Sequence, residues 1–172
     1  MNYKMMGRFI GHILVVETIF MIPALLISLF KKEKMAGIGF AASIGIILFF
    51  ALLLIVFSKG SKKSFKAKEG LVCVSISWIV MSLLGCLPFY ISREIPSYVN
   101  ALFETVSGFT TTGASILSDI EGLSMGIIYW RSFTHWLGGM GVLVFVLAVG
   151  ASGESSKGFT MHLLRAESPG PQ

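Results

Sequence analysis

Charged side chains are scarce in this chain of 172 residues: Asp, Glu, Lys and Arg together make up 13% of it. A soluble domain of this size carries about 25% charged residues. Hydrophobic residues make up 54%, and the mean hydropathy is +0.79. The scarcity of charge excludes an ordinary soluble domain. The long apolar runs that remain predict an all-α integral membrane protein.

Cysteine and histidine are also scarce, with two and three residues. Cys73 and Cys86 are separated by roughly 20 Å if they share one helix, so a disulfide is excluded there and both are predicted to be packing residues. His135 is a candidate metal or haem ligand with His12. The two lie on different predicted helices near opposite membrane sides, so a hydrogen-bonding role at the interface is favoured for His135. The sequence shows no nucleophile–base pair, which argues against an enzyme.

Four apolar runs reach the length of about 20 residues that a helix needs to span a bilayer. They are Phe9–Phe30, Met35–Phe57, Leu71–Tyr90 and Met125 to about Val149. The first run could be a signal peptide, but its length and the lack of a small-residue cleavage pattern after it favour a retained helix. In the second run, small residues at four-residue intervals predict a face for close helix approach. They are Gly37, Ala41 and Gly45.

A shorter apolar segment, Tyr98–Phe109, precedes the polar stretch Thr110–Ser115. Its twelve residues are too few for a ~30 Å hydrocarbon core, so we predict a pore helix that enters the membrane and returns as a re-entrant loop. Non-helical backbone at membrane depth is tolerated only where protein surrounds it or where it lines a water-filled path. The alternative is a helix N-cap and turn without a role in ion binding, since Thr and Gly favour such positions.

Backbone carbonyls can replace the hydration shell of K⁺, and glycine permits the dihedrals that point them at an ion. The stretch predicts a filter that binds K⁺ as the transported ion, with no other cofactor. Its residues are Thr111, Thr112, Gly113, Ala114 and Ser115, the first four being the K⁺ ligands. Their order resembles the Thr-Val-Gly-Tyr-Gly filter of potassium channels, with serine replacing the last glycine. That replacement leaves selectivity for K⁺ over Na⁺ open.

Three residues before the filter are predicted to support it: Glu104, Gly108 and Thr110. Glu104 lies on the predicted pore helix, where its carboxylate could hydrogen-bond the loop backbone. Trp130, Arg131 and Trp136 are predicted to anchor the last span at the interface. Glu17 lies within the first span, where burying an ionisable group is expensive. A functional role for Glu17 and a pairing with a neighbouring helix are both open.

Two segments, Phe103–Ser115 and Trp130–Gly141, resemble the Trk/Ktr potassium-uptake family. The closing Arg165–Pro171 resembles the segment after that family's first repeat, and the two leading helices resemble the extra N-terminal pair of its TrkH type. The resemblance covers roughly Leu71 to the end. It implies four helix–pore loop–helix repeats around one ion path, of which this chain carries the first. It also implies that three glycines lie beside the pore: Gly138, Gly139 and Gly141.

One repeat supplies a quarter of a filter, so we expect a potassium-uptake subunit that is the N-terminal portion of a longer transporter. A homotetrameric cation channel is an alternative. A second alternative is a non-transporting fragment or an accessory subunit that packs on complete transporters. The expected partners are membrane lipid, the remaining repeats or further copies of the chain and, by resemblance, a cytoplasmic nucleotide-binding regulatory subunit. No nucleic-acid partner is expected, because the lysines flank apolar runs.

The resemblance implies a bacterial inner-membrane protein. The basic residues predict that both termini lie in the cytoplasm, since nine Lys and Arg residues then fall inside and five outside. The expected organisation has four parts. Residues 1–58 hold two transmembrane helices, 59–70 a basic cytoplasmic loop, 71–150 the helix–pore helix–filter loop–helix repeat, and 151–172 a polar, truncated cytoplasmic tail.

Overall fold

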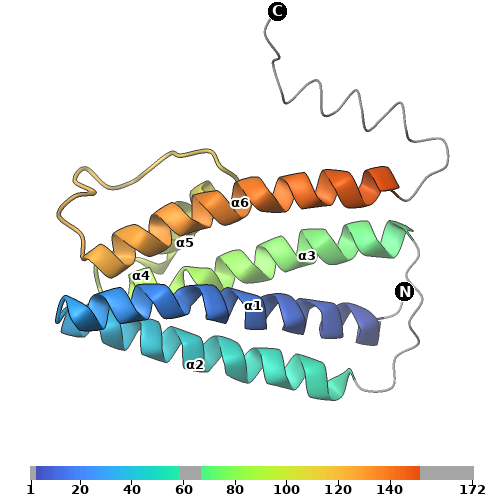
Figure 1. Ribbon diagram of the computed structural model, residues 1–172, viewed down its shortest axis with the longest axis horizontal. Helices are drawn as coiled ribbons and strands as arrows, with labels where there is room; N and C mark the ends of the chain where they lie inside the picture. The colour runs from blue at the N-terminus through green and yellow to red at the C-terminus, as the bar shows by residue number, and fades with distance from the viewer. Residues whose placement is uncertain (1–2, 59–66, 152–172) are drawn as a thin grey trace, which may run out of the picture.

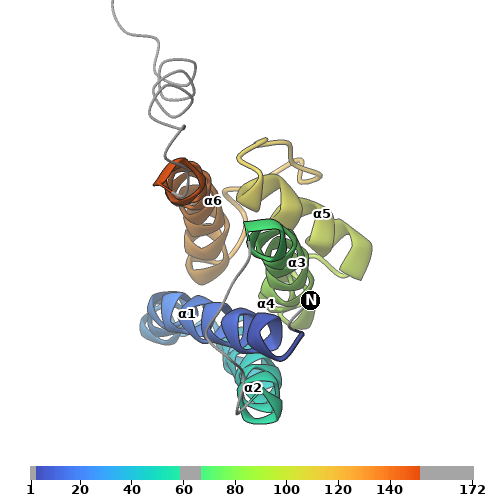
Figure 2. The same cartoon turned by 90° about the vertical axis from the view of Figure 1, so that its right-hand side faces the viewer.

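The computed structural model describes residues 3–58 and 67–151, with side chains described in 3–58, 70 and 72–141. The fold is all-α, as the sequence predicts. Its helices are α1 (Tyr3–Phe30), α2 (Lys34–Phe57), α3 (Ala67–Gly85), α4 (Leu87–Ile91), α5 (Tyr98–Phe109) and α6 (Met125–Ala151). The four long helices α1, α2, α3 and α6 run side by side, with α4 and α5 nearer one end (Figure 1). Viewed end-on, α2 lies on one side of α1, and α6 lies on the other (Figure 2).

Three segments of the described chain are long and apolar enough to cross a membrane: Tyr3–Phe30, Lys34–Phe57 and Val72–Ile91. They confirm the first three predicted spans. Helix α6 has 27 residues, which is sufficient length for a fourth. Its side chains are described only as far as Gly141, so the fourth span stays a prediction.

The start of α1 and the end of α6 lie at the same end of the bundle, as an even number of spans requires (Figure 1). The side of the membrane that this end faces stays a prediction. Two features on which that prediction depends, the lysines at 59–66 and the tail after Ala151, lie outside the described residues. The segment Arg165–Pro171, which supported the family resemblance, lies outside them as well.

Two helix boundaries differ from the sequence prediction. Helix α1 begins at Tyr3, six residues before the predicted apolar run, so its first turns carry Lys4 and Arg8. Helix α3 begins at Ala67, within the range predicted as a loop, and ends at Gly85. Cys86 then separates it from the short α4, which has Pro88 in its first turn. Proline has no N–H to donate to the preceding turn, which explains the break.

Helix α2 packs through a single face whose members recur at helical spacing: Ala36, Gly39, Phe40, Ser43, Ile47 and Ala51. Gly39 admits α4, since a Cβ there would lie 3.1 Å from the carbonyl oxygen of Pro88. Of the predicted small-residue face, Gly37 is buried, whereas Ala41 and Gly45 are exposed and nothing lies within 4 Å of a Cβ on Gly45. Within the described chain, no helix therefore packs closely at Ala41 and Gly45. Helix α2 carries apolar residues on all of its sides, so the spacing of residues in the sequence could not identify the packed face.

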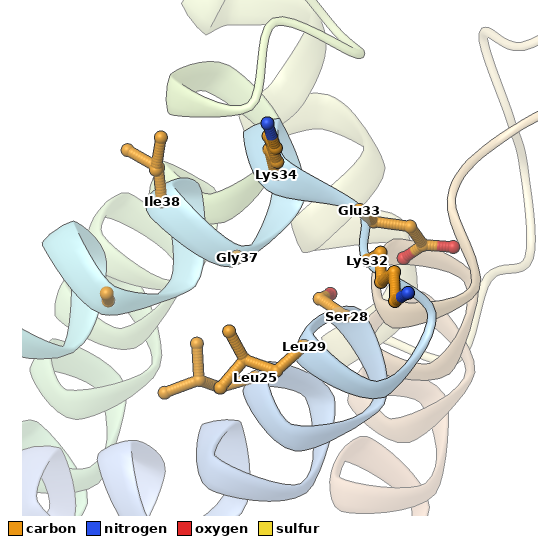
Figure 3. A pocket seen from close by; sticks show the side chains of 9 residues that line it. Leu25, Ser28, Leu29, Lys32, Glu33, Lys34, Gly37 and Ile38 are labelled. Carbon is orange, nitrogen blue, oxygen red and sulfur yellow. The ribbon is translucent and has the colours of Figure 1, made fainter.

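Glu33, in the turn between α1 and α2, ties this helical hairpin to the start of α6. Its Oε1 accepts a hydrogen bond from the Met125 N–H at 2.9 Å, and its Oε2 accepts one from the Gly126 N–H at 3.3 Å. The first N–H groups of a helix have no partner within the helix, and the helix dipole favours a negative charge there. Figure 3 shows the Glu33 carboxylate turned toward α6. This contact fixes where the last helix begins.

A cavity of about 470 Å³ opens beside the same turn, between α1 and α2 (Figure 3). Its wall is mostly apolar, with Leu25, Leu29 and Ile38 among its members, and Lys32 and Lys34 also line it. None of the residues predicted to bind or support an ion lines this cavity. It is therefore separate from the candidate site.

Replacing Glu33 with alanine should leave two N–H groups at the start of α6 without an acceptor. We expect a loss of about 1 kcal/mol, which lowers the midpoint of thermal unfolding in detergent by about 2–4 °C. Glu121→Ala, which removes an exposed acid from the loop before α6, is the control and should change the midpoint little. Equal midpoints for the two variants would show that Glu33 does not stabilise this junction.

Candidate functional site

Helix α5 is the predicted pore helix and has the predicted bounds, Tyr98–Phe109. One face of it is buried, with Ala101, Glu104, Thr105 and Gly108 at helical spacing. Phe103 and Val106, on the other face, are exposed. Twelve residues rise only about 18 Å, so α5 cannot cross the hydrocarbon core.

The end of α5 lies deep in the bundle, against the middle of α6. A Cβ added to Gly108 would collide with the Thr134 hydroxyl, and one added to Gly138 would collide with the carbonyl oxygen of Phe109. Gly138 is thirteen residues from the start of α6, a rise of about 20 Å. After α5 the chain returns as an irregular segment to the end of the bundle where α6 begins (Figure 1). The loop therefore starts beside the middle of α6 and returns to the end of the bundle where α6 begins, which is the path predicted for a re-entrant loop.

The threonine run forms the C-terminal cap of α5. The Thr111 N–H donates to the Gly108 carbonyl at 2.9 Å, and the Thr112 N–H donates to the Ser107 carbonyl at 3.0 Å. These bonds are those of a Schellman motif, which places one residue in the left-handed region and usually uses glycine there. Here the residue is Thr111, at φ 56°. A β-branched residue in this region is strained, and such strain tends to occur at functional sites.

The carbonyls of the next residues are left without partners. Within the described chain, the carbonyl oxygens of Thr111, Thr112 and Gly113 accept no hydrogen bond, and all three residues are exposed. Gly113 has φ 75°, which a residue with a side chain rarely adopts. The Ala114 carbonyl differs, since it accepts a hydrogen bond from the Ser107 hydroxyl at 2.6 Å. The amides of Thr111, Thr112 and Gly113 thus bond back to the end of α5, whereas the carbonyls of the same three residues stay open.

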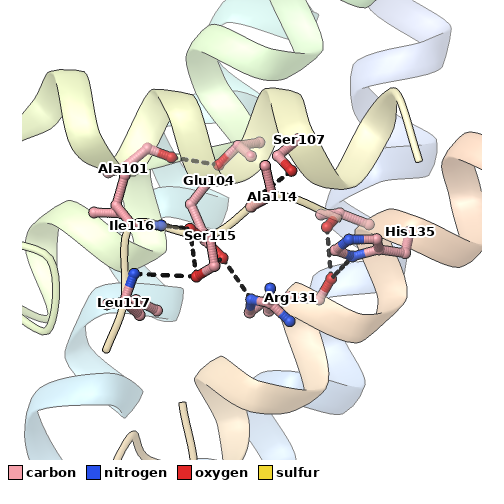
Figure 4. Close-up of polar contacts among 11 residues, drawn as sticks. Ala101, Glu104, Ser107, Ala114, Ser115, Ile116, Leu117, Arg131 and His135 are labelled. Carbon is pink, nitrogen blue, oxygen red and sulfur yellow. Dashed lines mark hydrogen bonds and ion pairs between the residues drawn. The ribbon is translucent and has the colours of Figure 1, made fainter. Parts of the chain in front are cut away.

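Glu104 holds the far side of the loop (Figure 4). Its carboxylate accepts hydrogen bonds from the Ser115 hydroxyl at 3.0 and 3.1 Å and from the Ile116 N–H at 3.2 Å. The Ser115 hydroxyl oxygen in turn accepts the Leu117 N–H at 3.1 Å. The side chain predicted to support the filter is therefore hydrogen-bonded to the residues that end it.

Arg131, from α6, neutralises this carboxylate. Its Nε lies 2.5 Å from Glu104 Oε1, and the side chains of Arg131 and Glu104 are 15% and 0% exposed. A buried carboxylate is tolerated only when it is paired and hydrogen-bonded, and both conditions hold here. The ion pair joins the pore helix, the loop and α6 in one network (Figure 4).

Two of the three predicted interfacial anchors are instead internal. Arg131 pairs with Glu104, and Trp130 is fully buried, with its Nε1–H donating to the Gly85 carbonyl at 2.9 Å. Trp136 is 54% exposed. The interfacial prediction is therefore wrong for Arg131 and Trp130. Helix α6 packs against the loop and α3, so its polar groups point into the protein, where they find partners, and not toward lipid.

The three glycines predicted to lie beside the pore have different surroundings. Gly138 touches the backbone where α5 ends, Gly141 lies against the Trp78 ring, and a Cβ on exposed Gly139 would lie 4.0 Å from Cγ2 of Thr111. Gly138 and Gly139 adjoin the loop, whereas Gly141 serves packing against α3. Among the supporting residues, Thr110 shares a hydrogen bond with the Thr112 hydroxyl at 2.8 Å.

The remaining candidates make no hydrogen bond to the loop within the described residues. A ring nitrogen of His135 is hydrogen-bonded to the Arg131 carbonyl and one of His12 to the Arg8 carbonyl, and the described residues contain no group of His, Cys, Asp and Glu suited to a metal. Cys73 and Cys86 are buried and free, as predicted. Both oxygens of buried Glu17 lack a hydrogen-bond partner among the described residues, so its pairing with a neighbouring helix is not observed.

Sequence reasoning missed two residues that shape the loop, Ser107 and Arg131. Ser107 caps the loop through its carbonyl and fixes Ala114 through its hydroxyl. A hydroxyl one turn before the end of a pore helix is a weak signal. Arg131 offered a stronger one, because an arginine in an apolar helix needs an acid, and Glu104 is the acid of the adjoining pore helix.

Arg131→Gln should strongly destabilise the protein, since it leaves the Glu104 charge buried without a partner, a change that costs about 3–5 kcal/mol in other proteins. The double variant Glu104→Gln, Arg131→Gln buries no charge and should lose less. Thermal unfolding in detergent compares the two, and amide exchange at Ile116 reports the loop. A single variant as stable as the double would contradict the role given to the ion pair.

The comparisons with known proteins agree with this architecture. The Trk system potassium uptake protein TrkH of Halomonas elongata is 32% identical over 99% of this chain, and TrkG of Escherichia coli K12 is 30% identical over 99%. The crystal structure of the potassium transporter TrkH from Vibrio parahaemolyticus matches 96% of the chain with a TM-score of 0.81 and 27% identity.

The chain spans about a third of the length of these proteins: 35% of the Halomonas protein, 34% of TrkG and 37% of the crystallised chain. The match corresponds to the N-terminal part of TrkH. The family described as TrkH, cation transport protein, matches residues 38–166, which include α5, the loop and α6. The predicted resemblance is confirmed, and the chain belongs to the TrkH cation transport family.

Proposed function

We propose that this chain supplies one pore loop of a K⁺ uptake path, with the carbonyls of Thr111, Thr112 and Gly113 as ligands. Ala114, the fourth predicted ligand, would join them through the second lone pair of a carbonyl that already accepts the Ser107 hydroxyl. The observation that carries the proposal is the row of open carbonyls. Thr111, Thr112 and Gly113 are exposed and accept no hydrogen bond within the described residues, although the loop starts well inside the span. Unsatisfied carbonyls at that depth need a cation or water, and K⁺ filters are built from such groups.

The charge distribution around the loop favours a cation. Helix α5 ends at the loop, and the C-terminal end of a helix carries a partial negative charge of about half an elementary charge. Arg131 is paired with Glu104 on the supporting side. Its positive charge is therefore compensated and does not oppose a cation at the open carbonyls.

A single loop cannot surround an ion. Further loops would come from sequence beyond these 172 residues or from other copies of the chain, and the relatives, which are about three times as long, favour the first source. Influx would follow the membrane potential, which contributes about 2.3 kcal/mol per charge per 100 mV. We propose the orientation with the start of α1 and the end of α6 in the cytoplasm, where a nucleotide-binding regulatory subunit would bind.

The transport test uses cells that lack their own K⁺ uptake systems, at low external K⁺. The chain is expressed alone and also fused to the remaining two-thirds of the Halomonas protein. We expect the fusion to restore K⁺ uptake and Gly113→Asp to abolish it at equal membrane abundance, because the carboxylate would occupy the ion's position. Uptake that survives this substitution would remove the loop from the ion path. Uptake by the chain alone, with the same sensitivity, would assign the other loops to further copies.

Substitutions at Gly113 and Gly45 distinguish the effect of backbone geometry from the effect of added side-chain volume. Nothing lies within 4 Å of a Cβ on Gly113 or on Gly45, but only Gly113 has a positive φ, at 75°. Gly113→Ala should therefore strain the loop by about 1 kcal/mol and reduce uptake, whereas Gly45→Ala should leave uptake unchanged. Equal uptake by the two variants would mean that the left-handed geometry at Gly113 is not required.

A further inference from the structure

Glu17 is the buried acid that the loop network does not use. It lies at the middle of α1, is 1% exposed, and neither carboxylate oxygen has a hydrogen-bond partner among the described residues. An ionised carboxylate without a partner in apolar surroundings is very unfavourable, so the group takes up a proton and becomes neutral. Intramembrane acids of this kind often carry protons or ions.

The carboxylate lies behind the end of the pore helix, with one glycine between them. A Cβ placed on Gly85 would lie 2.6 Å from Glu17 Oε1 and 3.3 Å from Cε2 of Phe109, the last residue of α5. The next residue, Thr110, begins the loop. A charge on Glu17 would therefore act on the loop through apolar packing, where electrostatic interactions are screened far less than in water.

A cavity of about 190 Å³ lies beside Glu17. Glu17 lines it together with His12 of α1, Met81 of α3 and Leu137 of α6. Its wall is almost entirely apolar, and both oxygens of the Glu17 carboxylate are buried. Apolar cavities hold no ordered water, so this side offers a charged carboxylate no polar partner and favours the protonated group. His12, which is exposed, is the other titratable residue of the lining.

The titratable groups on the surrounding helices do not neutralise Glu17. Cys86, between α3 and α4, adjoins Gly85 and carries no positive charge. On α2, the described charge is Lys34, at the start of the helix. Helices α5 and α6 carry Tyr98, Glu104, Tyr129, Arg131 and His135. Glu104 and Arg131 pair with each other, and Tyr98 and His135 hydrogen-bond to the Leu83 and Arg131 carbonyls.

We propose that Glu17 is a proton-binding site whose protonation is linked to cation binding at the loop. The linkage rests on the proposed function, whereas the proton site itself does not. A cation at the loop favours the ionised carboxylate, and by reciprocity a proton on Glu17 weakens cation binding. Lowering the pH therefore reduces K⁺ affinity. Gln at position 17 resembles the protonated acid and holds the affinity at its low value at every pH.

The proton site is tested by infrared spectroscopy of the chain fused to the remaining two-thirds of the Halomonas protein, in lipid vesicles, with Glu17→Gln as the reference. We expect the C=O band of a protonated carboxyl at about pH 7 in the parent protein, absent from the variant, and weaker when K⁺ replaces a large organic cation. An absent band would overturn the proton site. A band that K⁺ leaves unchanged, in vesicles whose K⁺ uptake depends on Gly113, would overturn the linkage.

Uptake measured against pH gives the second readout. The K⁺ concentration for half-maximal uptake should rise about tenfold in the parent protein as the pH falls through the range in which Glu17 takes up its proton, a coupling of ordinary size. It should not change with pH in Glu17→Gln. Thr18→Val, which alters the neighbouring buried residue without a titratable group, should keep the parent's pH response. A pH response retained in Glu17→Gln would contradict the linkage. If uptake is insensitive to Gly113, the proposed function fails, while the infrared band still decides the proton site.

Discussion

The structure depends on one constraint: a backbone that leaves helix inside a membrane must find partners for its polar groups within the protein. After α5 the chain meets this demand for several of its donors and leaves a row of acceptors open. Thr111 and Thr112 donate to carbonyls of the last turn of α5, and Ile116 donates to Glu104. The open carbonyls lie between these two fixed points. The segment can therefore be ordered and still present oxygens to an ion.

The ion pair between Glu104 and Arg131 makes this arrangement possible. Glu104 binds the return of the loop, and Arg131 cancels its charge from α6. Close packing then sets the distance between α5 and α6. Gly138 of α6 lies against the carbonyl of Phe109, and Gly108 of α5 lies against the side chain of Thr134. Glu33, in the turn between α1 and α2, fixes the start of α6 through hydrogen bonds to its first two N–H groups. The loop, both helices and the leading hairpin thus form one continuous set of contacts.

Much of this could be predicted from the sequence, because apolar length and polar interruption are strong signals in a membrane protein. The bounds of the pore helix, Tyr98–Phe109, and the support of the loop by Glu104 followed from them. The packed face of α2 and the inward positions of Trp130 and Arg131 did not. These helices carry apolar residues on all sides, so their hydropathy pattern does not identify the buried face. The position of the neighbouring helix decides which side is buried.

The central claim is that the carbonyls after Thr110 bind the transported cation. The most direct measurement is anomalous X-ray diffraction from crystals of the transporter containing this chain, grown with Rb⁺ in place of K⁺. We expect an anomalous peak in contact with the carbonyl oxygens of Thr111, Thr112 and Gly113, and its loss in Gly113→Asp. Ordered carbonyls with no Rb⁺ peak beside them, in crystals of a protein that takes up Rb⁺, would contradict the assignment of this loop to the ion path.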